Sequence, residues 1–431
     1  MRRTAPLTAS YRARPYWWDG VDLPQAGPAR LPATADVAVV GGGYTGLAAA
    51  MEIARAGRHV VVLDRDDIGA GASSRNGGMV HPGGKHDLSE FLAQPNGRRL
   101  WDETVTAFEA VGSLAAELGV SFDWQRRGHL ELAHHPRLAA RQRAVADAYA
   151  RIGEEARFVG ASELRAEIGS DRFHGGLLVV RSAGIQPAKL AAGLARAASG
   201  SGAELHGATT VLALSRRGQG FDLETSRGAL RCGEVVVATN GTTDGRLVPW
   251  LGRRVLSIGS YMIATEPLDP AITASVNPHG RMFFDTRNLL HYWRLSPDGT
   301  RILFGGRTSL SPTTVERSRD QLYGAMIDLH PQLAGVAVER AWGGRVALTA
   351  DRFPHVGRHG GTGVVYAMGY CGSGVALSVH FGRALGRWLC GDGTLPAFGD
   401  RAWRPMPWPA RAPWLLAAAG MGFKVRDALG R

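Results

Sequence analysis

The chain has 431 residues, 45% of them apolar, and this length predicts two or three domains with ordinary buried cores. Lys and Arg number 50 against 38 Asp and Glu, which gives a formal net charge of +12. Because the arginines are scattered and form no long basic run, no nucleic-acid-binding surface is predicted.

The N-terminal segment and the cysteines indicate the compartment. Arg2 and Arg3 are followed by Pro, Tyr, Trp and Arg instead of an apolar stretch, so no export signal is predicted. Residues 36–50, the least charged stretch, are too short and too rich in glycine to span a bilayer. The three cysteines lack C-x-x-C spacing, which indicates neither a disulfide framework nor a zinc site. We therefore expect a soluble, cytoplasmic protein; its oligomeric state does not follow from the sequence.

A dinucleotide-binding βαβ unit is predicted over residues 35–64. Residues 37–40 form a short apolar run that is typical of a buried parallel strand. The glycine-rich turn 41–46 follows, and it leads into the helical stretch 47–56. Residues 59–63 predict the second parallel strand.

The residues of this unit match the mechanics of a dinucleotide site. Gly41 permits the tight turn, Gly43 lets the backbone approach a pyrophosphate, and Gly46 lets helix and strand pack closely. The helix start offers unpaired N–H groups and partial positive charge to the phosphates. Asp64, at the end of the second strand, is placed to accept hydrogen bonds from both ribose hydroxyls.

Two later segments favour FAD over NAD. Residues 235–241 predict a buried strand that ends in small residues, where a backbone passes close to a ligand. A further strand, 364–368, is followed by the glycine loop 369–374 and the helical stretch 375–389. A second glycine-rich helix start suits a flavin ring, because reduced flavin carries negative charge at its N1 and C2 carbonyl end.

These stretches resemble the D-amino-acid oxidase superfamily of FAD-dependent oxidoreductases, particularly the gamma-glutamylputrescine oxidase-like proteins, over nearly the whole chain. The most specific stretch is residues 35–79, where the glycine turn is followed by Ile-Gly-Ala-Gly-Ala-Ser-Ser-Arg-Asn-Gly-Gly at 68–78. Residues 369–375 resemble the family's Gly-Tyr-Ser-Gly-His-Gly-Val loop. Residues 342–357 and the tail 420–427 match as well.

The resemblance implies which residues bind FAD. The glycine turn would hold the pyrophosphate, the backbone of Val211 would meet the adenine, and residues 372–375 would face the pyrimidine edge of the flavin. Residues 73–76 would run along the cofactor toward the ring. The cofactor-binding residues predicted in this way are Gly41, Gly43, Tyr44, Thr45, Gly46, Asp64, Arg65, Ser73, Ser74, Arg75, Asn76, Gly77, Val211, Thr239, Asn240, Gly372, Ser373, Gly374 and Val375.

Three departures from the family pattern concern the chemistry. Cys371 and Ser373 stand where relatives often have Ser and His, so a role for a ring-edge histidine is in doubt. Leu303 aligns with a Lys that assists oxygen in sarcosine-oxidase relatives, which weakens the case for oxygen as the acceptor. No cysteine lies near Leu348 and Thr349, where some relatives attach the flavin, so we expect non-covalent FAD.

The predicted fold is α/β, with a Rossmann-like FAD-binding domain and an inserted α+β substrate domain built on an antiparallel sheet. The limits are 30–88, 155–250 and 342–395 for the discontinuous FAD-binding domain, 89–154 and 251–341 for the substrate domain, and 396–431 for a C-terminal extension. In the substrate domain, residues 90–118 predict a helix and 122–133 include a strand.

A β-hairpin is predicted where residues 289–295 and 301–306 flank the turn Ser-Pro-Asp-Gly. Strand alternation places Leu290, Tyr292 and Arg294 on one face and His291 and Trp293 on the other, and either face could line the pocket. Arg294 and Arg307 are candidates for a bidentate contact with a substrate carboxylate, although the ordinary interpretation of each, which we favour, is a solvated arginine in an arginine-rich protein. The predicted catalytic residues are Tyr292, Arg294, Arg307 and Tyr370.

Three further features have ordinary interpretations that we favour. His134 and His135 lack other ligands at chelating spacing, so a solvent-facing pair and no metal site are predicted. Cys371 is either a reactive thiol or, as we favour, a small residue in a tight loop. Trp403, Trp408 and Trp414 mark a membrane-surface or partner contact or, as we favour, a tail packed on its own domain.

The sequence thus predicts an FAD-dependent oxidoreductase that acts on the carbon–nitrogen bond of a small amine or amino acid. Hydride would pass to flavin N5, with O2 as acceptor and release of H2O2, and the imine would hydrolyse. One alternative is a dehydrogenase that passes electrons to a quinone or carrier protein. A second is a non-catalytic FAD-containing binding protein. The identity of the substrate is not predicted.

Overall fold

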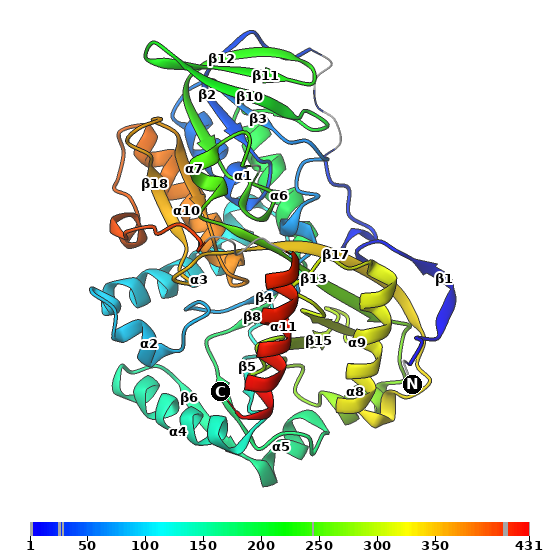
Figure 1. Ribbon diagram of the computed structural model, residues 1–431. Helices are drawn as coiled ribbons and strands as arrows, with labels where there is room; N and C mark the ends of the chain where they lie inside the picture. Colours follow the sequence, from blue (N-terminus) through cyan, green and yellow to red (C-terminus); the bar gives the residue numbers. More distant parts are fainter. Residues whose placement is uncertain (1–2, 25–26, 28–29, 244, 408–412, 431) are drawn as a thin grey trace.

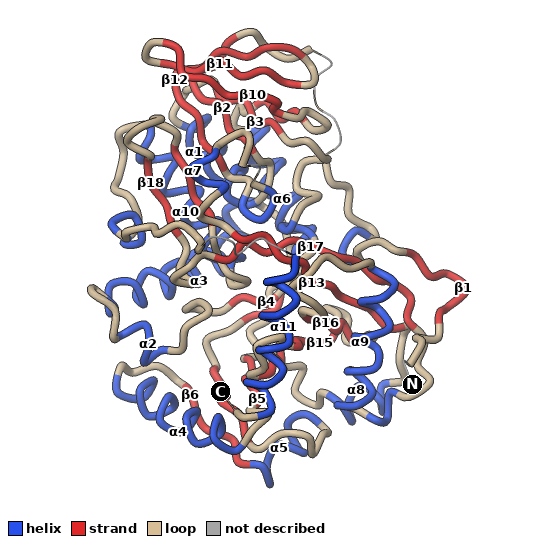
Figure 2. The backbone as a smooth tube through the Cα atoms, viewed as in Figure 1, coloured by secondary structure: helices blue, strands red, loops and turns tan. Residues whose placement is uncertain are grey.

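The computed structural model describes residues 3–24, 27, 30–243, 245–407 and 413–430. Figure 1 shows two lobes, each built around a β-sheet, and Figure 2 shows strands β13 and β17 crossing the middle of the molecule between them. Segments from many parts of the chain contribute to each lobe.

The first lobe is organised by an eight-stranded sheet. Its order is β10 (Val211–Arg217), β11 (Gly220–Thr225), β12 (Gly228–Val237), β2 (Thr34–Val40), β3 (Val60–Leu63) and β9 (Glu204–His206), and β19 (Val365–Met368) joins β12 and pairs with β18 (His355–Arg358). The pairs β2–β3, β3–β9, β2–β12 and β12–β19 are parallel. The sequences of the central strands are continuous apolar runs, and their residues are buried, as is typical of a parallel sheet that is covered on both faces.

The second lobe is organised by a nine-stranded sheet. Its order is β1 (Leu7–Arg12), β17 (Val338–Leu348), β13 (Leu256–Thr265), β16 (Ile302–Gly306), β15 (His291–Leu295), β14 (Met282–Asp285), β5 (His129–Leu132), β7 (Gly175–Val179) and β6 (Ala156–Gly160). The predicted hairpin is confirmed, since β15 and β16 pair in antiparallel fashion. Most pairs are antiparallel, but β1–β17 and β5–β14 are parallel. A small ribbon, β4 (Met79–Val80) with β8 (Ala183–Gly184), lies apart.

The helices cover these sheets and connect them. They are α1 (Tyr44–Arg55), α2 (Leu88–Leu92), α3 (Gly97–Leu118), α4 (Pro136–Arg151), α5 (Ala161–Ile168), α6 (Pro187–Gly200), α7 (Pro249–Gly252), α8 (Pro270–Val276), α9 (Val315–Leu329), α10 (Gly374–Leu389) and α11 (Pro413–Ala428). None of them, in the part of the chain that the structure describes, combines the length and apolar character that a membrane span requires.

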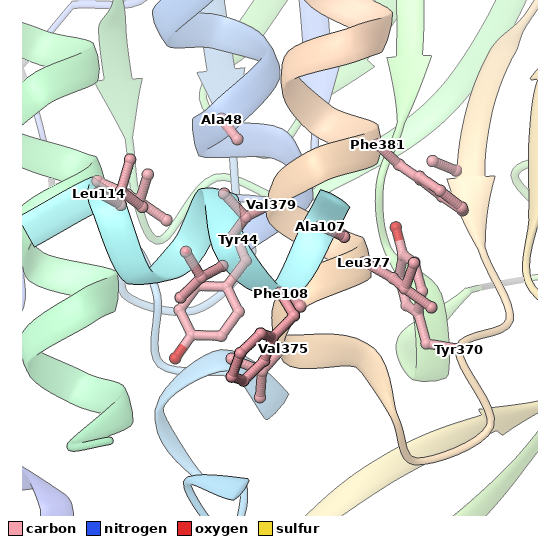
Figure 3. Packing of buried hydrophobic residues seen from close by; sticks show 14 of the residues in the cluster. Tyr44, Ala48, Ala107, Phe108, Leu114, Tyr370, Val375, Leu377, Val379 and Phe381 are labelled. Atoms are coloured by element: carbon pink, nitrogen blue, oxygen red, sulfur yellow. The ribbon is translucent and has the colours of Figure 1, made fainter. Parts of the chain in front are cut away.

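Helices α1, α3 and α10 share one apolar core. Figure 3 shows Tyr44 of α1, Phe108 of α3 and Val375 of α10 gathered at the same place. Helices α1 and α10 approach closely because α10 carries glycine at the contact: a Cβ on Gly382 would lie 2.3 Å from the carbonyl oxygen of Thr45. This packing fixes the first turn of α1 beside the middle of α10.

Sheet membership corrects the predicted domain limits. Residues 156–179, which form β6, α5 and β7, were expected in the FAD-binding domain, but they belong to the nine-stranded sheet. Strand β17 also belongs to that sheet, although it includes the start of the predicted segment 342–395. An apolar pattern in the sequence shows that a strand is buried, but it does not show which of the two sheets the strand joins. The domain limits can therefore be assigned only from the observed strand pairing.

Candidate active site

A cavity of about 650 Å³ lies beside the glycine turn that joins β2 to α1. We call it the glycine-loop cavity. Its volume is in the range of sites that take small molecules and cofactors. Predicted cofactor residues from distant parts of the sequence meet in its wall: Gly41, Gly43, Tyr44, Thr45, Asp64, Arg65, Ser73, Arg75, Asn76, Thr239, Asn240, Gly372, Gly374 and Val375.

The glycine turn forms a concave backbone surface, a cradle, whose space would be occupied by side chains if its residues were not glycine. Gly41 has a φ of 110°, and a Cβ there would lie 2.9 Å from the backbone of Ala238. A Cβ on Gly43 would lie 2.9 Å from the Ser73 hydroxyl oxygen. Gly46 is outside the cavity wall, but a Cβ on it would lie 1.9 Å from the carbonyl oxygen of Gly41, so glycine keeps α1 against the turn. Because the first N–H groups of a helix have no intrahelical partner, this cradle fits a pyrophosphate.

Asp64 is held at the end of β3 by backbone donors. Its carboxylate accepts a hydrogen bond of 2.7 Å from the N–H of Gly42 and one of 3.0 Å from the N–H of Asp66. Burial raises its pKa and outweighs these hydrogen bonds, which favour the charged form. A carboxylate can accept about four hydrogen bonds, so the acceptor positions that remain suit ribose hydroxyls.

Four predicted cofactor residues lie elsewhere than expected. Val211, the first residue of β10, is not in the wall of the glycine-loop cavity; Ala208, three residues earlier, lines it. Ser74 is fully buried and lines no described cavity. Gly77 and Ser373 line a neighbouring cavity instead. At Val211 the contact with the cavity moves three residues along the chain to Ala208, and sequence spacing alone does not predict this displacement.

The N-terminal segment supplies a wall residue that the sequence analysis missed. Trp18 lines the glycine-loop cavity and donates a hydrogen bond of 2.9 Å from its indole N–H to the Ser74 hydroxyl oxygen. The guanidinium of Arg75 lies 4.5 Å from the centre of the Trp18 ring. Trp17 donates to the carbonyl oxygen of Asn76 at 2.7 Å. The adjacent Trp-Trp pair in an otherwise polar N-terminal segment was the available signal.

A second cavity, of about 290 Å³, lies over the face of the nine-stranded sheet, and we call it the sheet-face cavity. Its floor is formed by side chains of β5, β14, β15 and β13, and residues 81–87 border it. The two cavities share the wall residues Ala72, Arg75, Asn76, Gly344, Arg345, Val346, Gly372 and Val375. A ligand that fills the first cavity therefore reaches the second at these residues.

Tyr292 lies on the floor near this junction. Its hydroxyl is 3.1 Å from the Ser260 hydroxyl, and burial raises its pKa. The ring occupies the space that two glycines leave, since a Cβ on Gly305 or Gly77 would come within 2.4 or 2.9 Å of it. Leu290 lines the same cavity, so the face of β15 that carries Leu290 and Tyr292 is the one that faces it. Trp293, on the other face, is buried in the core.

The two candidate arginines have different environments. Arg307 is 9% exposed and lines the sheet-face cavity, and its one side-chain hydrogen bond to the described residues is a long contact of 3.4 Å from Nη2 to the carbonyl oxygen of Cys371. Burial lowers its pKa. Arg294 lies in neither of these cavities, because its guanidinium donates to the carbonyl oxygens of Gly78 at 2.6 Å and Ile185 at 3.0 Å. The prediction that Arg294 binds a substrate is therefore corrected: its donors hold the backbone together.

Tyr370 and its neighbours also divide between the cavities. Tyr370 lines the glycine-loop cavity and shares a hydrogen bond of 2.8 Å with the Thr45 hydroxyl, so it lies on the cofactor side and not among the substrate-side residues. Cys371 has a φ of 56° and lines the sheet-face cavity, and burial raises the pKa of its thiol. Leu303 is fully buried among apolar side chains, outside both cavities.

Charged side chains that the sequence analysis did not select also line the sheet-face cavity. Burial lowers the pKa of Lys85 to about 8 and raises the pKa of Glu131 to about 7. Burial opposes ionisation of Asp285, but His291 at 3.0 Å and Arg287 at 2.5 Å outweigh it and lower its pKa. Strand alternation over 129–132 was the only available signal for Glu131.

The remaining predicted features have structural partners. His134 contacts the Thr286 hydroxyl at 2.7 Å, and His135 caps α4, so the pair is tied down and not simply solvent-facing. Within the described ranges, no group of His, Cys, Asp and Glu side chains is arranged to hold a metal ion. Trp403 stacks on His355 with ring centres 4.6 Å apart, whereas Trp414 is 67% exposed and Trp408 lies outside the described residues.

Comparisons with known proteins agree with this geometry. The family model DAO, described as FAD dependent oxidoreductase, matches residues 36–388. Gamma-glutamylputrescine oxidoreductase of Escherichia coli is 31% identical, over 92% of this chain and 94% of the relative, and a probable oxidoreductase OrdL of Haemophilus influenzae is 30% identical, over 83% of each. The crystal structure of glycine oxidase from Geobacillus kaustophilus has the same fold, with a TM-score of 0.73 at 22% identity, over 87% of this chain and 99% of that one.

Proposed function

Because this chain belongs to the DAO family of FAD-dependent oxidoreductases, we propose that it oxidises the carbon–nitrogen bond of a small amine or amino acid. The observation that carries the proposal is the junction of the two cavities, where a cradle for a dinucleotide meets a polar cavity of about 290 Å³. Glycine oxidase and gamma-glutamylputrescine oxidoreductase, both similar to this chain, are named for substrates of this class.

FAD, when bound, supplies the hydride acceptor, and the protein supplies orientation and electrostatics. The start of α10 lies at the junction, where the unpaired N–H groups of a helix N-terminus stabilise negative charge. Arg307 has donors left for a substrate carboxylate. Tyr292, fixed by Ser260 and two glycines, forms a rigid floor that orients the amine. The substrate amine enters deprotonated, and the imine product hydrolyses after release.

We propose O2 as the electron acceptor, with release of H2O2. The alignment of Leu303 with an oxygen-assisting Lys no longer counts against this, because Leu303 is buried in the core and contacts neither cavity. The alternative is a dehydrogenase that passes electrons to a quinone or a carrier protein.

Anaerobic reduction of the flavin tests the proposal. Polyamines, N-methyl amino acids, D-amino acids and gamma-glutamyl amines are mixed with the holoenzyme without air, and at least one is expected to bleach the flavin absorbance. If none does, the alternative of a non-catalytic FAD-containing protein is favoured. Admission of air to the reduced enzyme then separates the acceptors, since rapid reoxidation with stoichiometric H2O2 is expected for the oxidase only.

We also propose that the FAD is not covalently attached. Cys371, which lines the sheet-face cavity, has a thiol with a raised pKa, and its sulfur lies 3.2 Å from the carbonyl oxygen of Gly369. A thiol rather than a thiolate is a weak nucleophile. Acid precipitation of the holoenzyme is expected to leave the yellow colour in the supernatant; colour retained in the washed pellet would overturn this.

A further inference from the structure

A third cavity, of about 300 Å³, lies beside the hairpin that joins β14 to β15, and we call it the outer cavity. That hairpin, the segment after β16 and helices α9 and α11 contribute its wall, which consists of Arg287, Leu289, His291, Arg307, Thr308, Gln321 and Asp427. Gln321 is exposed to solvent, whereas Arg307 is 9% exposed. The outer cavity thus extends from the surface of the protein to a buried guanidinium.

One turn of the chain separates the outer cavity from the sheet-face cavity. Thr286 and Leu290 line the sheet-face cavity, while Arg287 and Leu289, which lie between them in the chain, line the outer cavity. Among the residues that the structure describes, Arg307 alone lines both cavities. The two spaces therefore lie on opposite sides of one thin wall, and the side chain of Arg307 is the part of that wall that both of them reach.

The turn in this wall is held by hydrogen bonds to two carboxylates. Asp285 accepts one of 3.0 Å from the N–H of His291 and one of 3.2 Å from the N–H of Arg287. Asp427 of α11 accepts two from Asn288, at 2.9 Å from its N–H and at 2.7 Å from its side-chain amide. Hydrogen bonds to ionised acceptors are the stronger class, so the backbone of the turn is a fixed part of the wall.

Arg307 is the movable part of the wall. The 3.4 Å contact of its Nη2 with the carbonyl oxygen of Cys371 is longer than the usual range of about 2.7 to 3.2 Å for such a bond. A carboxylate would form shorter, charge-assisted bonds with the same donors, each about twice as strong as a bond to a neutral acceptor. A carboxylate in the outer cavity can therefore draw the guanidinium away from Cys371.

The junction of the two larger cavities lies directly behind Arg307. Gly372 lines both the glycine-loop cavity and the sheet-face cavity. It is also a neighbour of Arg307, since a Cβ on Gly372 would lie 3.4 Å from Nη2 of that residue. One side chain thus separates the outer cavity from the place where we expect the cofactor and the substrate to meet.

We propose that the outer cavity is the entrance for the substrate, and that Arg307 opens it by exchanging the carbonyl oxygen of Cys371 for the substrate carboxylate. Arg307 binds the carboxylate in the outer cavity and keeps it as the substrate moves to the junction, so that one residue serves both for access and for binding. Small molecules with a carboxylate therefore enter faster than neutral ones of the same size. That the molecule which enters is a substrate rests on the proposed function, whereas the route itself does not.

Alkylation of Cys371 measures the route without turnover. Cys371 is buried and lines the sheet-face cavity, whereas Cys390 is partly exposed and lines none of the three cavities, so it serves as an internal reference. In the holoenzyme, T308W adds an indole to the wall of the outer cavity. It is expected to slow the reaction of Cys371 with iodoacetamide about 10-fold, which is a barrier higher by about 1.4 kcal/mol, without an effect on Cys390.

The rates are compared from about pH 7.5 to 10, because only the thiolate reacts and burial raises the pKa of the Cys371 thiol. A lower rate at every pH indicates reduced access, whereas a change in the pKa would displace the profile along the pH axis.

Matched variants separate a blocked cavity from a structural effect. T308A also loses the hydroxyl that lies 3.0 Å from that of Ser318, but it adds no bulk, so Cys371 should react as in the wild type. T106W adds the same indole to an exposed position of α3 outside the three cavities and should also behave as wild type. L289W, on the hairpin, should repeat the effect of T308W. If Cys371 is not alkylated in the wild type, if both blocking variants leave its rate unchanged, or if Cys390 slows equally, the proposed route is wrong.

The charge of the reagent tests the part that Arg307 plays. Iodoacetate carries the carboxylate that iodoacetamide lacks, and the ratio of the two rates is expected to be about 10-fold higher at Cys371 than at Cys390. R307M should remove this preference, and R307K should keep part of it. T308W should slow both reagents. An equal ratio at the two cysteines of the wild type would contradict access controlled by Arg307.

The same variants distinguish failure of the route from failure of the proposed function. If T308W and L289W slow the alkylation of Cys371 but no amine reduces the flavin, the proposed function fails and the route stands. If amines at limiting concentration reduce the flavin equally fast in the wild type, T308W and L289W, the route fails and the proposed function stands.

Discussion

Arg307 is the cationic residue of the sheet-face cavity that the proposed chemistry uses most directly. Its guanidinium has one long hydrogen bond to the part of the chain that the structure describes, so most of its five N–H donors are left for a substrate carboxylate. Its mutation should therefore affect substrate binding without loss of FAD, because it does not line the glycine-loop cavity.

We expect R307M to raise KM about 10- to 100-fold for a carboxylate-bearing substrate, which corresponds to the loss of about 1.5 to 3 kcal/mol from a hydrogen bond to a charged group. R307K should be intermediate, because lysine offers a point charge in place of a planar fork. Steady-state kinetics and the flavin content of each variant measure this. An unchanged KM, or loss of FAD with KM, would show that Arg307 has a structural role.

At the scale of elements, the first turn of α1 is fixed from two sides. Gly46 holds it against the glycine turn, and α10 holds it from the other side through Gly382 and Gly386. The N-terminal segment adds a further constraint, because Trp17 and Trp18 are hydrogen-bonded to residues 74–76. The cradle for the pyrophosphate is therefore a property of several packed elements and not of the glycine motif alone.

We expect G46A to lose FAD, because its Cβ would come within 1.9 Å of a backbone oxygen and the turn would have to move. The FAD content after purification should fall below about a tenth of wild type, which corresponds to about 1.4 kcal/mol or more of lost binding free energy. G324A is the matched control, since a Cβ on Gly324 of α9 meets nothing within 4 Å and alanine favours a helix. Full FAD content in G46A would show that the turn adapts.

At the scale of the whole molecule, the glycine-loop cavity draws on both sheets. The turn at residues 41–46 belongs to the eight-stranded sheet, whereas Gly344, Arg345 and Val346 come from β17 of the nine-stranded sheet. A cofactor that fills this cavity contacts both lobes. Its binding free energy should therefore stabilise them together.

We expect the apoprotein to unfold in a single thermal transition that moves to higher temperature when FAD is added. At a free FAD concentration of 100 times Kd, the free energy of unfolding should rise by about 2.7 kcal/mol. ADP, which would occupy only the part of the cavity near Asp64 and the glycine turn, should produce a smaller shift. Calorimetry with a series of FAD concentrations measures this. Two transitions of which only one moves with FAD would show that the lobes unfold independently.

The sequence by itself determined the cofactor and the local elements. The βαβ unit, the second glycine-rich helix start and the hairpin at 291–306 are local patterns, since a tight turn needs glycine and a buried parallel strand needs a continuous apolar run. Family membership and the FAD dependence followed from the same residues. These features depend on neighbours along the chain, and for that reason spacing was sufficient.

Only the tertiary structure decided what faces the substrate. Arg294 and Tyr292 lie on one face of β15, yet backbone carbonyls take the donors of Arg294 while Tyr292 lines the cavity. Lys85 and Glu131 are 46 positions apart and were indistinguishable from surface charges in the sequence. Their common cavity exists because β5 pairs with β14 and β7, and pairing between distant strands depends on long-range packing that no local pattern encodes.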